Sequence, residues 1–277
     1  MSDTILSPHS SEAVRAAARR LLHAARDRRP CAPVRDLIGA DDVAAAYAVQ
    51  GWLTEYRLAT GARVVGRKIG LTSPAVQAQL GVDRPDFGVL FDDMDVSAGP
   101  VPTERLLQPK VEAEVAFVLG EDLADGDLAL DQVRGAVAYA MAALEIVDSR
   151  VEGWDITFGD TVADNASSGL YVLGDRRVGL DAFTPIEARM ELEVDGSVVS
   201  TGDGTACLGD PLLALTWLAR TLRELGDPLL AGQVVLSGAL GPMVPVSSGA
   251  VVTARISGLG EVHTTFSDSE SPGGRPA

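Results

Sequence analysis

Apolar residues recur every three to four positions in the first sixty residues, the spacing of amphipathic helices. The two predicted helices run from a cap at Ser10 or Ser11 to Pro30, and from Asp41 or Asp42 to Gly61. The apolar face predicted for the second helix contains Ala46, Val49, Leu53 and Tyr56. We therefore expect a small helical N-terminal region over residues 1–62.

Beyond Arg63 the pattern changes to short β-branched runs separated by Gly, Pro and Asp, which predicts strands joined by turns. The predicted strands are RVVGRKIGL, KVEAEVAFVL, ALEIV, RMELEV, GSVVS, QVVLSG and AVVTARISG. The dipeptide Asp195-Gly196 lies between two alternating runs and predicts a β-hairpin turn.

Two further helices are predicted where a capping side chain precedes a proline, because proline favours the first helical turn. They run from Ser73–Pro74 to Gly81 and from Asp210–Pro211 to Gly226. We expect residues 63–266 to form one β-rich domain on which the N-terminal helices pack, and residues 267–277 to be a disordered tail.

Composition and charge exclude several classes of partner. The 277 residues are 46% hydrophobic and 22% charged, as in soluble globular proteins, and their formal net charge of −16 disfavours nucleic acid and anionic membrane surfaces. The two cysteines, Cys31 and Cys207, are too few for a secreted disulfide framework, which favours the cytoplasm. The uncharged stretch 228–254 contains prolines and glycines, so it predicts buried strands rather than a membrane helix.

Several motifs of known chemistry are absent or incomplete. Gly61 and Gly66 have the spacing of a phosphate loop, but Arg67 and a predicted strand follow them. A dinucleotide fingerprint would need glycine at Cys207. The three histidines have no zinc-ligand spacing, and no G-x-S-x-G elbow is present. Nucleotide, zinc and serine-hydrolase chemistry therefore lose support.

Two E-x-E pairs on predicted strands differ in their surroundings. In RMELEV the acidic residues share a face with Arg189 and Asp195, which predicts a solvated face. In KVEAEVAFVL, Glu112 and Glu114 lie on the same face of the strand as Ala116 and Val118. Both faces of this strand are therefore predicted to be buried.

Buried carboxylates two residues apart repel each other at about 7 Å and each costs several kcal/mol to desolvate. Glu145, between Leu144 and Ile146, would be equally costly if unpaired. Three carboxylates suit a hard cation such as Mg²⁺ or Mn²⁺. Surface acids with one salt-bridged core glutamate are the alternative interpretation.

Four further polar residues are candidates for chemistry. Lys68 lies in an apolar predicted strand, and burial would lower its pKa toward the range useful for proton transfer. Asp86, Asp164 and Ser167 fall in turn-like segments, where polar side chains often only cap backbone groups.

These segments together resemble a known family. The motifs are VGRKIGLTSPAVQAQLGVDRPDFGVLFDDM, VEAEVAFVLGEDL, ALEIVDSR, DTVADNASSG, LGDPLLALTWLARTL and VVLSGALGPMVPV. They resemble the 2-keto-4-pentenoate (2-hydroxypenta-2,4-dienoate) hydratases of the fumarylacetoacetase-like superfamily, from about Leu37 to Phe266. The resemblance implies an α+β protein in which the small N-terminal helical region packs on a mixed β-roll.

The resemblance also implies a site. Glu112, Glu114 and Glu145 match the carboxylates that hold Mg²⁺ or Mn²⁺ in this family, and Lys68, Asp86 and Ser167 match residues placed around the substrate. Lys68, oriented by Asp86, is the expected proton carrier, and Ser167 is expected to hold the substrate or the water. Arg67 is a further candidate for attracting the anionic substrate.

The activity implied is metal-dependent hydration of 2-hydroxypenta-2,4-dienoate to 4-hydroxy-2-oxopentanoate in meta-cleavage catabolism of aromatic compounds. The alternatives are a 2-oxo-3-hexenedioate (4-oxalocrotonate) decarboxylase, a 2-oxohept-3-enedioate hydratase and a non-catalytic oligomer that binds 2-oxo acids. The family resemblance further implies a pentamer or decamer, with a downstream aldolase or upstream decarboxylase as possible partners.

Overall fold

The computed structural model describes residues 11–73, 77 and 84–267. The helix predicted from Ser73–Pro74 to Gly81 lies mostly outside the described residues. Of the disordered tail predicted over residues 267–277, the structure describes only Ser267, which hydrogen-bonds Val101 and Thr103. The described helices are α1 (Glu12–Asp27), α2 (Arg35–Ile38), α3 (Val43–Ala59), α5 (Leu130–Ala136), α6 (Phe158–Ala163) and α7 (Pro211–Glu224).

The strands alternate with these helices and with short 3₁₀ turns along the chain. They are β1 (Val64–Gly70), β2 (Asp86–Phe91), β3 (Pro109–Leu119), β4 (Val137–Asp148), β5 (Ser168–Leu173), β6 (Arg189–Val194), β7 (Ser197–Asp203), β8 (Val234–Ala239), β9 (Val244–Pro245), β10 (Val251–Ile256) and β11 (Gly260–Thr265).

The described strands form two sheets. The larger has the order β2-β1-β8-β3-β4-β5, with β9 paired to β3, and the smaller has the order β11-β10-β6-β7. Only β1 and β8 pair in parallel within the larger sheet, so it is mixed. The two sheets share one apolar core to which Phe117, Leu144, Met190 and Val252 contribute. This arrangement confirms the predicted α+β class.

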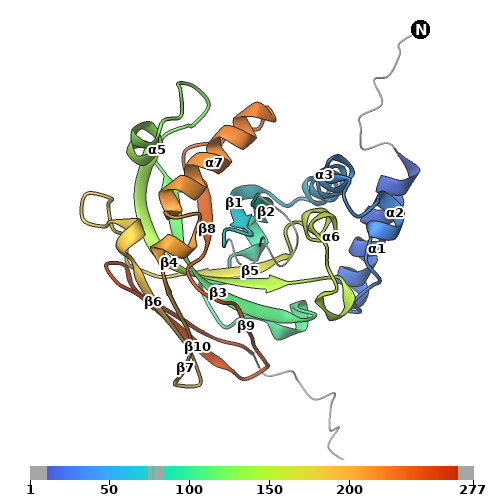
Figure 1. Cartoon of the computed structure of the whole chain (residues 1–277). Coiled ribbons are helices and arrows are strands. Elements are labelled where there is room, and N and C mark those ends of the chain that lie inside the picture. The colour runs from blue at the N-terminus through green and yellow to red at the C-terminus, as the bar shows by residue number, and fades with distance from the viewer. Residues whose placement is uncertain (1–10, 74–76, 78–83, 268–277) are drawn as a thin grey trace, which may run out of the picture.

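The N-terminal helices gather on one side of the molecule beside α6, and α5 and α7 lie on the other (Figure 1). A second apolar cluster joins α1 and α3 to α6, with Leu21, Val49 and Val162 among its buried members. Ser11 accepts a hydrogen bond from the Val14 amide and Asp42 caps α3, as the sequence predicts. The helices therefore pack on the β-rich part through α6.

Some local predictions are wrong. Tyr56, predicted on the apolar face of the second helix, is 40% exposed, whereas polar Gln50 is buried and donates hydrogen bonds to the carbonyls of Phe87 and Val162. The segment containing Asp86, predicted to be turn-like, is a buried strand, β2, because its backbone pairs with β1.

The predicted hairpin at Asp195-Gly196 is confirmed, with both residues at positive φ.

Candidate metal and substrate site

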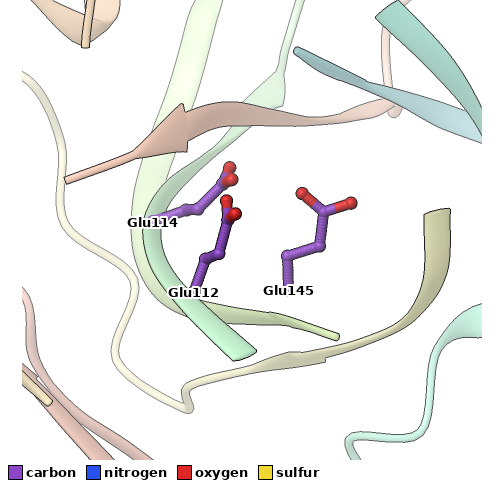
Figure 2. Close-up of side chains that lie close together, drawn as sticks. All are labelled: Glu112, Glu114 and Glu145. Carbon is purple, nitrogen blue, oxygen red and sulfur yellow. The ribbon is translucent and has the colours of Figure 1, made fainter. Parts of the chain in front are cut away.

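The side chains of three glutamates on strands of the larger sheet point toward one another (Figure 2). Glu112 and Glu145 face each other directly across the antiparallel β3–β4 pair, and Glu114 lies two residues further along β3. One carboxylate oxygen from each residue lies within 4.8 Å of those of the other two. The alternation of side chains along β3 therefore brings Glu112 and Glu114 to the same point, as the E-x-E spacing predicts.

The carboxylates are enclosed but poorly satisfied. Glu114 and Glu145 are buried, and Glu112 is half-buried. Glu114 Oε2 accepts a hydrogen bond from the Gly238 amide at 2.8 Å. Glu114 Oε1 and Glu145 Oε2 lack hydrogen-bond donors in the described part of the chain, and Glu145 Oε1 has only an ion pair, with Lys68. Buried acceptors without donors are costly, so this arrangement fits the oxygen ligands of a cation.

Burial and mutual repulsion hold protons on the cluster. Burial, followed by repulsion from Glu145, raises the pKa of Glu112 to about 7. The same two causes raise the pKa of Glu114 well above its usual range, with Glu112 adding to them. A divalent cation would replace these protons, so the three residues could hold a metal ion.

Lys68 lies beside this cluster on β1. Its Nζ is 3.2 Å from Glu145 Oε1 and donates a hydrogen bond of 3.0 Å to the carbonyl of Ala166. Burial lowers the pKa of Lys68, but attraction by Glu145, Asp86 and the other glutamates outweighs it, so the pKa lies above its ordinary value. The prediction that burial would lower this pKa is therefore wrong, because the sequence did not reveal how many carboxylates surround the ammonium group.

Asp86 reaches the same region from β2, where it pairs with Gly70 of β1. A Cβ atom at Gly70 would lie 2.2 Å from Asp86 Oδ1 and 3.4 Å from Lys68 Nζ, so this glycine makes room for both charged groups. Burial raises the pKa of Asp86 to about 6, against the attraction of Lys68. Neither oxygen of Asp86 has a hydrogen-bond donor within the described residues.

Ser167 belongs to a tight turn between α6 and β5. Asn165, Ala166 and Ser167 all have positive φ, and the Asn165 side chain fixes the turn by bonding both the amide and the carbonyl of Val89. The Ser167 hydroxyl lies 3.1 Å from Thr161 Oγ1. The turn therefore presents the Ala166 carbonyl to Lys68, while the described contact of the Ser167 hydroxyl is to Thr161.

Asp164 and Arg67 serve other contacts. Asp164 pairs with Arg150 at 2.5 Å, and Arg150 also donates to the carbonyls of Asp148 and Ser168, which ties the turn to β4. Burial raises the pKa of Asp164 to about 6. Arg67 lies on the opposite face of β1 from Lys68 and pairs with Asp227 at 2.5 Å. The expectation that Arg67 joins the site is therefore wrong.

Gly238 is a site residue that the sequence analysis missed. Its amide anchors Glu114, its φ is +107°, and a Cβ atom there would lie 2.4 Å from Thr72 Cγ2. The available signal was a glycine inside a predicted strand, which often marks a close approach of another group.

A cavity of about 390 Å³ lies elsewhere, between α1, α3 and the loop before β3. Five arginines line it. Arg57 and Arg105 both pair with Asp93, Arg150 pairs with Asp164, Arg26 pairs with Asp27, and Arg28 donates a hydrogen bond to the Arg105 carbonyl. Each of these guanidinium groups therefore already has a partner within the described residues.

Cys31 and Cys207 are both free thiols. Within the described residues, no helix combines the length and apolar character needed to span a bilayer.

Comparisons with known proteins extend these observations. The profile of the family described as fumarylacetoacetate (FAA) hydrolase, C-terminal, matches residues 76–267. The TodF product hydratase of Pseudomonas putida F1 is 53% identical over 92% of this chain and 95% of its own length. The 2-keto-4-pentenoate hydratase 2 of Dechloromonas aromatica is 54% identical over 96% of this chain and 100% of its own.

Among solved structures, 4-oxalocrotonate decarboxylase from Pseudomonas putida G7, complexed with magnesium and adipate, superimposes with a TM-score of 0.87. It is 35% identical, and the match covers 92% of this chain and 97% of that one.

Proposed function

The chain belongs to the fumarylacetoacetate hydrolase family, and we propose that within this family it is a 2-keto-4-pentenoate hydratase, a hydro-lyase of aromatic-compound catabolism. The observation that carries this assignment is the identity of more than half to hydratases along nearly the full chain. The decarboxylase is a more distant match. The family resemblance drawn from the sequence motifs is thereby confirmed.

The proposed reaction adds water to a short dienol acid. Protonation of the terminal carbon of 2-hydroxypenta-2,4-dienoate, with loss of the 2-hydroxyl proton, gives an α,β-unsaturated 2-oxo acid. Water then adds to the fourth carbon and the third carbon is protonated. The product is 4-hydroxy-2-oxopentanoate.

We assign the metal site to Glu112, Glu114 and Glu145, with Mg²⁺ or Mn²⁺ as the ion. The unsatisfied oxygens of Glu114 and Glu145 and the raised pKa values support this assignment. When bound, the ion supplies Lewis-acid stabilisation of the negative charge that develops on the 2-oxygen of the substrate.

Lys68 is the proposed proton donor. The surrounding carboxylates outweigh its burial and raise its pKa above the ordinary value, and Glu145 and the Ala166 carbonyl fix its position. General acids so placed contribute on the order of 10²–10⁴ in rate. With the charge of the glutamates offset by a bound cation, the ammonium group could deliver the proton that the substrate carbon takes up.

Asp86 is the proposed partner of Lys68 in proton movement. With a pKa of about 6 it is mostly ionised at neutral pH, and its oxygens have no competing donor within the described residues. It can orient Lys68 across Gly70 and accept the proton that the adding water releases. We assign Ser167 to binding the substrate or this water, with Thr161 orienting its hydroxyl.

The direct test supplies freshly generated 2-hydroxypenta-2,4-dienoate to purified protein with Mg²⁺ or with EDTA. Dienol absorbance follows consumption, and proton NMR identifies the product. Metal-dependent formation of 4-hydroxy-2-oxopentanoate is expected. Carbon dioxide release from 2-oxo-3-hexenedioate instead would indicate the decarboxylase, and 2-oxo-acid binding without turnover of either substrate would indicate a non-catalytic protein.

The assembly and cellular setting belong to the same proposal. We expect a homo-oligomer, pentameric or decameric, in the cytoplasm, receiving substrate from a decarboxylase or passing product to an aldolase. Sedimentation velocity of the purified chain measures the oligomer directly.

A further inference from the structure

The three glutamates differ in exposure. Glu114 and Glu145 are buried, whereas Glu112 keeps part of its surface exposed. Along β3, Glu112 lies closer than Glu114 to the start of the strand at Pro109. We call this more exposed side of the cluster, at Glu112, the mouth of the site.

Lys110 lies at this mouth. It precedes Glu112 by two residues on the same strand, so the two side chains leave β3 on the same face, about 7 Å apart. The Lys110 ammonium group lies 4.1 Å from the centre of the Trp154 ring and is half-buried. A cation–π contact of this kind holds the charge in place without neutralising it.

The ring that holds Lys110 is itself fixed. The Trp154 indole nitrogen donates a hydrogen bond of 3.0 Å to the Gln108 carbonyl, and the Gln108 side chain accepts one of 2.7 Å from the Gly153 amide. Trp154 ends the 3₁₀ turn η4 (Glu152–Trp154), which is therefore attached to Gln108, the residue directly before β3. The ammonium group has a defined position rather than a free surface position.

Lys110 remains an unneutralised cation. Whereas Lys68 lies against Glu145, no carboxylate in the described part of the chain forms an ion pair with Lys110. The chain as a whole carries a net charge of −16, and three carboxylates lie directly beyond the mouth. An approaching anion would be repelled by this field unless a local positive charge compensates for it.

We propose that Lys110, held over Trp154, binds the carboxylate of the 2-oxo acid at the mouth of the site. Lys110 is then a substrate-binding residue that takes no part in proton transfer. This inference rests on the proposed function for the class of substrate. It assigns to Lys110 the role that the sequence had suggested for Arg67, whose side chain lies on the far face of β1.

The test compares Lys110→Gln with Lys110→Arg, which keeps both the charge and the contact with the ring. For Lys110→Gln we expect KM to rise about tenfold with kcat nearly unchanged, as loss of one charge contact predicts. Rising ionic strength should lower kcat/KM less, or raise it more, in this variant than in the unsubstituted chain, because the attraction that salt screens is missing. Lys110→Arg should stay close to the unsubstituted chain in both measurements.

A binding measurement separates this inference from the proposed function. Calorimetry with Mg²⁺ compares 2-oxopentanoate, a saturated acid that cannot be hydrated, with its uncharged methyl ester. Lys110→Gln should weaken binding of the acid about tenfold and leave the ester unaffected. Equal losses for acid and ester, or a fall in kcat at constant KM, would overturn the role of Lys110. Absence of hydration by the unsubstituted chain would overturn the function and leave the binding comparison valid.

Discussion

At the scale of single residues, Glu114 is the most enclosed carboxylate of the cluster, and one of its oxygens has no hydrogen-bond donor among the described residues. The structure thus combines a full desolvation cost with an incomplete set of partners, which a metal ion would complete. The same reasoning applies to Glu145, whose only close cation is Lys68 within the described residues.

Glu114→Gln should weaken Mg²⁺ binding by at least tenfold, because the amide supplies a neutral oxygen in place of a charged one. Isothermal calorimetry on the metal-free protein measures this change. The matched control is Glu191→Gln, since Glu191 is exposed on β6 and belongs to the solvated E-x-E pair. Unchanged Mg²⁺ affinity in Glu114→Gln would remove this residue from the ligand set.

Lys68→Met should abolish turnover, with a loss on the order of 10²–10⁴, while Mg²⁺ still binds. Binding should persist because Lys68 is a competing cation for Glu145 rather than a metal ligand. Steady-state kinetics and calorimetry on the same preparation measure the two effects. Near-normal turnover in this variant would exclude Lys68 as the proton donor.

At the scale of elements, the site depends on close approaches between neighbouring backbones. Gly70 of β1 admits the Asp86 carboxylate of β2, and Gly238 of β8 brings its amide to Glu114 of β3. The turn between α6 and β5 has three residues at positive φ and presents the Ala166 carbonyl to Lys68. Strain in this turn is offset by the hydrogen bonds of Asn165 and by the Arg150–Asp164 pair.

Gly238→Ala should destabilise the fold by about 1–3 kcal/mol, because alanine is strained at a φ of +107° and its Cβ would collide with Thr72. Mg²⁺ affinity should fall as well, since the amide that anchors Glu114 must shift. Thermal unfolding and calorimetry measure both effects. Gly135→Ala is the control, as Gly135 lies in α5 with open space around its Cβ position. Equal unfolding temperatures for the two variants would contradict this account.

At the scale of the whole molecule, buried acids couple folding to pH and to metal. Burial raises the pKa of Glu112 from 4.5 to about 7, and that of Asp86 from 3.8 to about 6. A raised pKa means that the folded state binds protons more tightly than the unfolded chain. Their contribution to the free energy of unfolding is therefore fully present at pH values below the pKa of the unfolded chain. It is lost as pH rises through the pKa of the folded state.

As pH rises from about 4 to about 7, the contribution of these groups should accordingly lower the free energy of unfolding of the metal-free protein. Added Mg²⁺ should restore it, with a larger gain in unfolding temperature above pH 7 than below, because the ion displaces protons from the cluster. Differential scanning calorimetry across this range, with Mg²⁺ or EDTA, measures both trends. A Mg²⁺ effect independent of pH would contradict the proton–metal competition.

The sequence by itself determined the class of fold, the capped helices, the hairpin at Asp195 and the choice between two E-x-E pairs. Each depends on local spacing: side chains alternate along a strand, and a charged pair flanked by apolar neighbours is recognisably buried. The cluster residues Glu112, Glu114 and Glu145 could be selected on this basis because the cost of burying charge is visible from their neighbours alone.

Only the tertiary structure decided how these groups meet. The β3–β4 register places Glu145 opposite Glu112, and the β1–β2 register places Asp86 opposite Gly70, diagonal to Lys68. The number of carboxylates around Lys68 reversed the expected direction of its pKa shift, and alternation on β1 sent Arg67 away from the site. Strand pairing, the charges that surround a titratable group and close backbone contacts all depend on residues far apart in the chain. The local sequence pattern therefore cannot predict them.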